Sequence, residues 1–107
     1  YTGNGSTDGT FVYTGFRPAW VMTKVTSTTQ SWNIMDNKRP GFNDTNKRLF
    51  ADLSNAEYSD STIELLSNGF KFRTADSGLN SSGASYIYMA FAENPFVTST
   101  GIPTTAR

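Results

Sequence analysis

The sequence reads Tyr86-Ile-Tyr-Met-Ala-Phe-Ala-Glu-Asn-Pro-Phe96 close to its C-terminal end, and this stretch is the most regular in the chain. Its side chains alternate with a period of two, which is typical of a β-strand because successive side chains point to opposite faces of a sheet. Both alternating sets are apolar, aromatic or small, so we expect a central strand that is covered on both faces. Pro95 cannot donate a ladder hydrogen bond, so the strand ends near Glu93 or Asn94.

The composition around this strand favours an all-β domain. Thr, Ser, Asn and Gly together make up 45 of the 107 residues, a mixture rich in turn formers and poor in helix formers. The 15 aromatic residues argue against a disordered chain. A chain of this length forms one domain with a modest core. We place the domain at residues 1–95 and expect residues 96–107 to form a C-terminal arm over its surface.

Further short segments alternate in the same way and are separated by turn residues. The pair Asn68-Gly69 predicts a tight hairpin turn with positive φ angles. Seven or eight short strands at this spacing predict a two-sheet β-sandwich with a jelly-roll-like strand order. The expected strands besides the first are Phe11–Tyr13, Ala19–Thr26, Trp32–Asp36, Arg48–Leu53, Ile63–Leu66 and Phe70–Arg73. The expected core residues are Val21, Ile34, Leu49, Leu65, Phe70, Phe72, Ile87, Met89 and Phe91.

Charge and residue types narrow the possible functions. The formal net charge is zero, and the few basic residues are interspersed with acids, so we expect no nucleic-acid partner. No apolar run is long enough to cross a bilayer, so we expect no membrane insertion. The chain has no Cys and no His, which removes thiol chemistry, disulfides, Cys/His zinc sites and His-based triads. We therefore expect no cofactor, and the oxygen-rich stretch 43–46 lacks the longer ladder of a calcium loop.

Several side chains have one chemical and one structural interpretation. Asp36, Asp44 and Asp52 resemble the carboxylates of a glycosidase, but nothing in their spacing forces any pair together. We expect them to end a strand, to form a turn and to face solvent, and we expect no enzyme activity. Trp20 and Trp32 suit sugar stacking, yet their place in a hairpin favours the core. Lys24 is expected to extend its ammonium to solvent or to pair with a carboxylate such as Asp36 across that hairpin, and not to act in catalysis.

Three polar loops are the expected recognition surface, at Asn37–Asn46, Ser54–Ser61 and Thr74–Ala84. Loops on a rigid sandwich are where binding residues usually lie. Within them, we expect the aromatic residues Phe42 and Tyr58 to anchor a ligand and Asp44 to be their polar partner.

Four segments carry a resemblance to a known family. They are Tyr1-Thr-Gly-Asn-Gly-Ser6, Phe11-Val-Tyr-Thr-Gly-Phe-Arg-Pro-Ala19, Leu66-Ser-Asn-Gly-Phe-Lys-Phe-Arg73 and Tyr86-Ile-Tyr-Met-Ala-Phe-Ala-Glu93. In this order, over nearly the whole chain, they resemble a β domain that recurs in phage virion proteins, especially tail fibres and tail-associated proteins of marine phages.

The resemblance implies a structural or adhesive part of an extracellular virion. The partners it implies are other virion subunits, including a homo-oligomer such as a trimer, and a glycan or protein on the host surface. It brings no catalytic residues. Host attachment is the function we expect first. A self-assembling or decoration module of the virion and a carbohydrate-binding module are the alternatives.

Overall fold

The described residues form β-strands and the connections between them. The computed structural model describes residues 1–39, 44–94, 96–97, 100 and 103–104, and these contain no helix and so no helical membrane span. Seven strands form one antiparallel sheet in the order β1-β6-β5-β4-β3-β2-β7, and two short strands pair separately. The strands are β1 (Phe11–Tyr13), β2 (Pro18–Val25), β3 (Asn33–Asp36), β4 (Asp44–Phe50), β5 (Tyr58–Leu66), β6 (Gly69–Phe72), β7 (Tyr86–Ala92), β8 (Phe96–Val97) and β9 (Pro103–Thr104).

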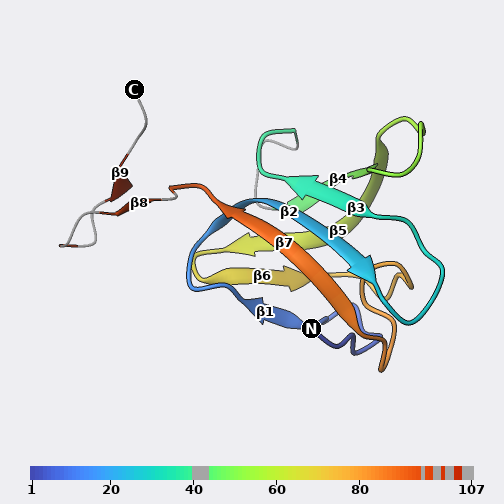
Figure 1. The fold of residues 1–107 in the computed structure, drawn as a ribbon. Coiled ribbons are helices and arrows are strands. Elements are labelled where there is room, and N and C mark those ends of the chain that lie inside the picture. Colours follow the sequence, from blue (N-terminus) through green and yellow to red (C-terminus); the bar gives the residue numbers. More distant parts are fainter. Residues whose placement is uncertain (40–43, 95, 98–99, 101–102, 105–107) are drawn as a thin grey trace.

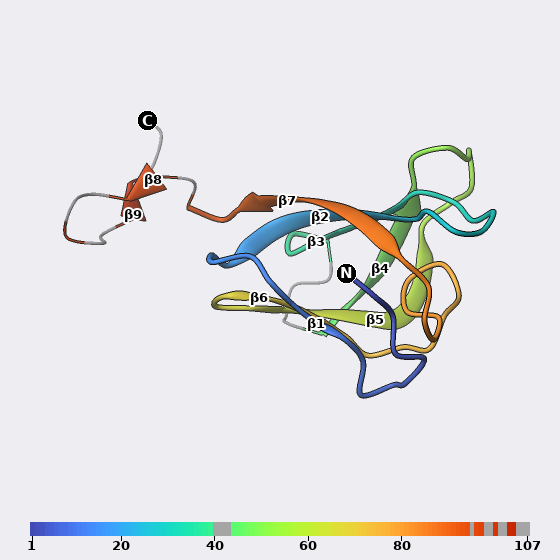
Figure 2. The same cartoon turned by 60° about the horizontal axis from the view of Figure 1, so that its bottom comes forward.

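The sheet folds over itself and makes two layers. Figure 2 shows β1, β6 and β5 below and β7, β2 and β3 above, with β4 joining the two layers. This confirms the all-β, two-sheet sandwich. The strand order is a meander, because each of β2 to β5 pairs with the next strand in the chain. Only β1 beside β6 and β7 beside β2 join strands distant in sequence, so the jelly-roll order is corrected.

The core lies between the two layers and is closed at one side by Tyr1. The ring of Tyr1 stacks on Tyr86 with centroids 4.8 Å apart, and its hydroxyl donates to the carbonyl of Leu79. Its backbone also exchanges two hydrogen bonds with Tyr86. The buried apolar cluster consists of Val12, Val21, Met35, Ile63, Leu65, Phe70, Phe72 and Leu79.

The most regular strand of the sequence differs from its prediction in two ways. β7 is an edge strand, because it pairs with β2 on one side only. Its faces are also reversed, since Tyr86 is buried while Ile87, Met89 and Phe91 are 50%, 50% and 58% exposed. The hydroxyl of Tyr86 explains this choice, because it donates to one carbonyl and accepts from the amide of Ser81 inside the protein.

The same reversal extends across the upper layer. Ile34 and Leu49, both predicted in the core, are only half-buried and lie on the outer face, because their neighbours Met35 and Arg48 point inward. The predictions for Val21, Leu65, Phe70 and Phe72 are confirmed.

Three further details of the sandwich differ from the sequence prediction. The hairpin between β5 and β6 is confirmed, but its two turn residues are Ser67 and Asn68, without positive φ. Trp20 is half-buried on the outer face, where its ring centroid lies 5.4 Å from that of Phe91. Asp36 is the cross-strand partner of Trp20, so it does not pair with Lys24, whose ammonium donates to the carbonyl of Val25.

The two last strands lie apart from the sandwich. β8 and β9 pair with each other beyond the end of β7 (Figure 1). The division of the chain into a domain of residues 1–95 and an arm of residues 96–107 remains a prediction.

Candidate binding pocket

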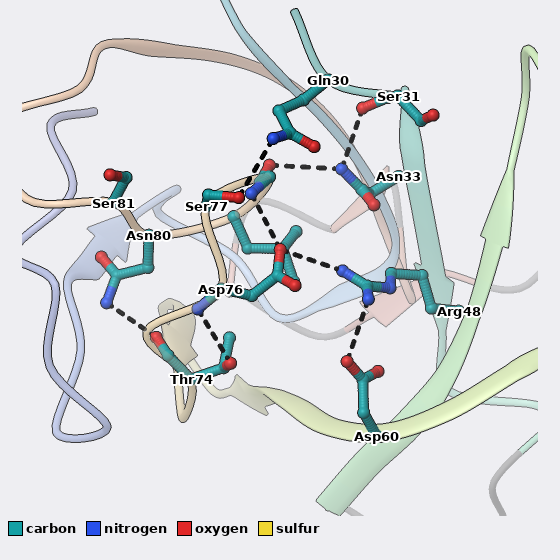
Figure 3. Close-up of polar contacts among 12 residues, drawn as sticks. Gln30, Ser31, Asn33, Arg48, Asp60, Thr74, Asp76, Ser77, Asn80 and Ser81 are labelled. Carbon is teal, nitrogen blue, oxygen red and sulfur yellow. Dashed lines mark hydrogen bonds and ion pairs between the residues drawn. The ribbon is translucent and has the colours of Figure 1, made fainter. Parts of the chain in front are cut away.

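A buried arginine on the inner face of β4 organises one end of the sandwich. The side chain of Arg48 is only 6% exposed and lies between two aspartates. One terminal nitrogen lies 3.0 Å from Asp60 of β5, and the other lies 3.3 Å from Asp76 in the connection between β6 and β7 (Figure 3). A buried guanidinium needs such partners, because an unpaired charge in the interior is strongly destabilising.

Two aromatic rings flank the same guanidinium. Its central carbon lies 5.3 Å from the ring centroid of Phe50 and 5.2 Å from that of Tyr58. The strand geometry places both rings, since Phe50 is two residues along β4 and Tyr58 is the cross-strand partner of Arg48 in β5. The stacked and doubly paired guanidinium is thereby held in one orientation.

Beside Arg48 the surface opens into a pocket of about 220 Å³. The connections β2–β3, β4–β5 and β6–β7 surround it, and all three lie at the same end of the sandwich (Figure 1). Arg48 is one of the lining residues, and its Nε atom is buried without a hydrogen-bond partner among the described residues. The lining residues are Gln30, Ser31, Asn33, Arg48, Phe50, Leu53, Asn55, Asp76 and Gly78.

The connection between β6 and β7 is built to hold Asp76 at the pocket. The carboxylate accepts from the amide of Gly78 at 2.8 Å, and the amide of Asp76 donates to the hydroxyl of Thr74 at 3.1 Å. Farther along, the two N–H groups of the buried Asn80 side chain are shared among three acceptors, the Oδ1 atom of Asn4 and the carbonyls of Ser6 and Thr74, each 2.9 Å from the nitrogen. The loop is therefore a bonded structure rather than a free connection.

Glycine at position 78 keeps the pocket open. A Cβ atom there would lie 3.1 Å from the Oδ1 atom of Asp76 and 3.4 Å from the Nδ2 atom of Asn33. The amide of Asn33 already donates to the carbonyls of Ser31 and Gly78. A methyl group at this position would crowd the polar groups that line the pocket.

The charged residues that line the pocket balance, because Arg48 is opposed by Asp76. One guanidinium faces two carboxylates. Burial raises the pKa of Asp60, the Arg48 guanidinium opposes this, and the charge of Asp76 adds to it. This charge balance disfavours an anionic ligand and suits a neutral polar one, because the pocket offers amide, carboxylate and guanidinium groups beside the apolar surfaces of Phe50 and Leu53.

Of the three predicted binding residues, the structure describes the side chain of Tyr58 only. Tyr58 is 52% exposed and lies at the start of β5 instead of in a loop, on the guanidinium of Arg48. Asp44 begins β4 opposite Glu64, so it is not a loop residue, and its side chain lies outside the described part of the structure. Phe42 also lies outside the described residues. The loop at Thr74–Ala84 is confirmed as irregular structure.

Sequence reasoning missed Arg48 and Asp76. The sequence signal was that Arg48 stands directly before the apolar Leu49, because neighbouring residues of a strand face opposite sides and one of the two must point inward. A charge on an inward position requires acidic partners from other elements, and their identity depends on the fold.

The aspartates once considered as a glycosidase pair have separate structural roles. Asp36 closes the turn after β3 by accepting from the backbone amides of Lys38 and Arg39 and from the Arg39 side chain. Asp52 accepts from the backbone amide of Trp32 at 3.0 Å. Among the described residues, no three acidic side chains gather as a metal site would require.

The fold and the pocket together define a β-sandwich module with a small polar pocket among the loops at one end. Comparison with known families gives a match over residues 1–95, to a family described as a domain of unknown function (DUF7483), and the chain belongs to this family. No curated protein and no solved structure matches the chain.

Proposed function

We propose that this chain is a non-enzymatic module of a phage virion, in a tail fibre or a tail-associated protein, that attaches to the host surface through the pocket beside Arg48. Placement in an extracellular virion rests on the resemblance of the four sequence segments. The binding role rests on one observation, the pocket at the loop end, whose lining combines amide side chains and the paired Arg48 and Asp76 with the apolar surfaces of Phe50 and Leu53.

The chemistry of the pocket favours a neutral sugar as the ligand. Each sugar hydroxyl both donates and accepts, and the pocket lining offers amide side chains from Gln30, Asn33 and Asn55. Phe50 and Leu53 offer apolar surface for the carbon–hydrogen face of a ring. A volume of about 220 Å³ is below the roughly 300–1,000 Å³ of sites for drug-sized ligands, so one ring of a host glycan fits better than a longer chain.

A binding role also suits these groups better than catalysis does. Both carboxylates nearest the pocket are held by the same guanidinium, and this leaves no separated acid and base for glycoside hydrolysis.

A glycan array probed with the 107-residue domain tests the proposal. We expect binding to neutral glycans, and we expect Asn55→Ala to weaken it about three- to tenfold, since one hydrogen bond contributes about 0.5–1.5 kcal/mol. Asn55 is exposed at the pocket rim, so the fold should be unaffected. Tyr13→Ala is the control, because Tyr13 is an exposed residue of β1, in the layer formed by β1, β6 and β5. Equal binding by both variants would place the ligand elsewhere, and an array without any binding would contradict the attachment role.

The alternative of a structural, self-assembling module is supported by a different observation. Ile87, Met89 and Phe91 form an exposed apolar row on β7, and such rows are rare on monomeric proteins.

A further inference from the structure

The two outer faces of this sandwich have opposite character. On the β1–β6–β5 layer, Lys71 and Arg73 contact Asp8 at 2.6 and 3.1 Å, and Arg73 also contacts Glu64 at 2.9 Å. Phe11 is the direct neighbour of Lys71 there. That outer face combines this network of ion pairs with the exposed rings of Phe11 and Tyr13.

The outer face of the other layer is apolar across four strands. The cross-strand register places Met89 beside Met22, Met22 beside Ile34, and Ile34 beside Leu49. We call this face, together with Ile87, Phe91 and Trp20, the apolar face. In Figure 2, β7 and β2 form the upper layer, and no described strand lies above them.

This face also explains why the sequence pattern was misleading. In the upper layer the outward residues Ile34, Leu49, Ile87, Met89 and Phe91 are the more apolar set, so they were predicted to form the core. Proteins usually have apolar residues inside and polar residues outside. A contiguous face where the sequence departs from this arrangement is typically a functional surface. Apolar surface of this kind is most often buried against another protein.

We propose that the apolar face is the contact surface for a second copy of this chain, packed face to face around a two-fold axis that runs across the strands. Charge placement selects this arrangement. Lys24 lies at one end of the face and Asp36, which also contacts Arg39, lies at the other end beside Trp20. An axis across the strands brings Lys24 of each copy over the partner's Trp20 and Asp36. An axis along the strands would bring the two Lys24 side chains together.

The size of the apolar face sets the strength of the contact. Five residues along β7 at about 3.3 Å each and four strands at about 4.8 Å each give a face of roughly 300 Å² in projection. Stable complexes bury about 800 Å² per partner, so the dimer is a weak and reversible one in solution. Its formation does not depend on the ligand pocket, which lies at the loop end.

Sedimentation equilibrium of the full 107-residue chain, from micromolar to millimolar concentration, tests this inference. We expect a monomer–dimer equilibrium for the unchanged chain. Met89→Lys, which places a charge at the centre of the apolar face, should raise the dissociation constant at least tenfold. Tyr13→Lys is the matched control, because it changes an aromatic residue that is 68% exposed on the other layer, and it should associate like the unchanged chain. Thermal unfolding of each variant establishes that it is folded.

One variant separates this contact from pairing of the open edge of β7. Because Tyr86 exchanges backbone hydrogen bonds with Tyr1, the amides of alternate residues, including Ala90, point away from β2. Ala90→Pro removes an edge donor without removing a bond to β2. The face-to-face dimer should survive this change. Loss of association with Ala90→Pro but not with Met89→Lys would overturn the proposal, as would a chain that remains monomeric at millimolar concentration.

Discussion

Phe72 of β6 and Phe91 of β7 have very different surroundings. Phe72 is fully buried and contacts the rings of Tyr1 and Phe70 with centroids 5.1 and 5.6 Å apart. Phe91 is 58% exposed. Phe72→Ala should therefore lower the free energy of unfolding by about 3–5 kcal/mol, while Phe91→Ala should lower it by less than about 1 kcal/mol. Urea denaturation at micromolar concentration, where the proposed weak dimer should be dissociated, measures both; equal losses would contradict the orientation of β7.

Asp36 gives a second residue-scale prediction, on acid stability. Burial raises the pKa of this carboxyl, but hydrogen bonds from Arg39 and from the Lys38 amide outweigh it, so the pKa lies below the ordinary value. The stabilisation is therefore present above the unfolded-state pKa of about 3.9 and is lost as the pH falls through the lower folded-state pKa. Asp36→Asn should lower stability at pH 7 and should flatten the fall in unfolding free energy below about pH 4. An unchanged acid profile would exclude this role.

At the scale of elements, the hairpin of β5 and β6 depends on a close approach by a third strand. Gly69 pairs with Tyr13 of β1, and a Cβ atom on Gly69 would overlap the carbonyl oxygen of Val12. Gly69→Ala should thus lower the free energy of unfolding by about 1–3 kcal/mol, because β1 must move away. Ser67→Ala, in the exposed turn of the same hairpin, should change it by less than about 0.5 kcal/mol. Similar values for both variants, measured by urea denaturation, would contradict this explanation of the glycine.

The positions of β1, β2 and β7 could be predicted from the sequence, whereas the buried face of β7 could not. Alternation and turn residues placed β1 as observed and β2 and β7 within a few residues, since these signals are local. Which face of a strand is buried depends on the whole fold. In β7 both alternating sets are apolar, and the choice depended on the partners that Tyr86 finds in the loop before β7.

The candidate site was only partly accessible for the same reason. Tyr58 was expected to bind, and its ring lies against the guanidinium of Arg48, although Tyr58 is not among the residues that line the pocket. The contact of Arg48 with Asp76 joins residues 28 positions apart. A local sequence pattern does not predict such a contact, because the contact depends on how three connections meet at one end of the sandwich.

At the scale of the whole molecule, the two proposed functions belong to two separate surfaces. The loop end carries the polar pocket, and the outer face of β7, β2, β3 and β4 carries the apolar face. A dimer formed through that face leaves both pockets free, because the lining residues come from the connections and the inner face. Two pockets on one rigid assembly would strengthen binding to a surface that repeats its ligand, since the second contact becomes intramolecular.

The most direct test of the central claim is a ¹⁵N NMR titration of the domain with a panel of neutral monosaccharides, in which the Nε–H signal of Arg48 is followed. Arg48 lines the pocket, and its Nε–H group, which has no hydrogen-bond partner among the described residues, reports on changes around the guanidinium. The account predicts that at least one sugar shifts this signal together with the amide of Gly78, while the amide of Tyr13 stays unchanged. A panel in which every sugar leaves the Arg48 signal in place would contradict the claim that this pocket binds a sugar.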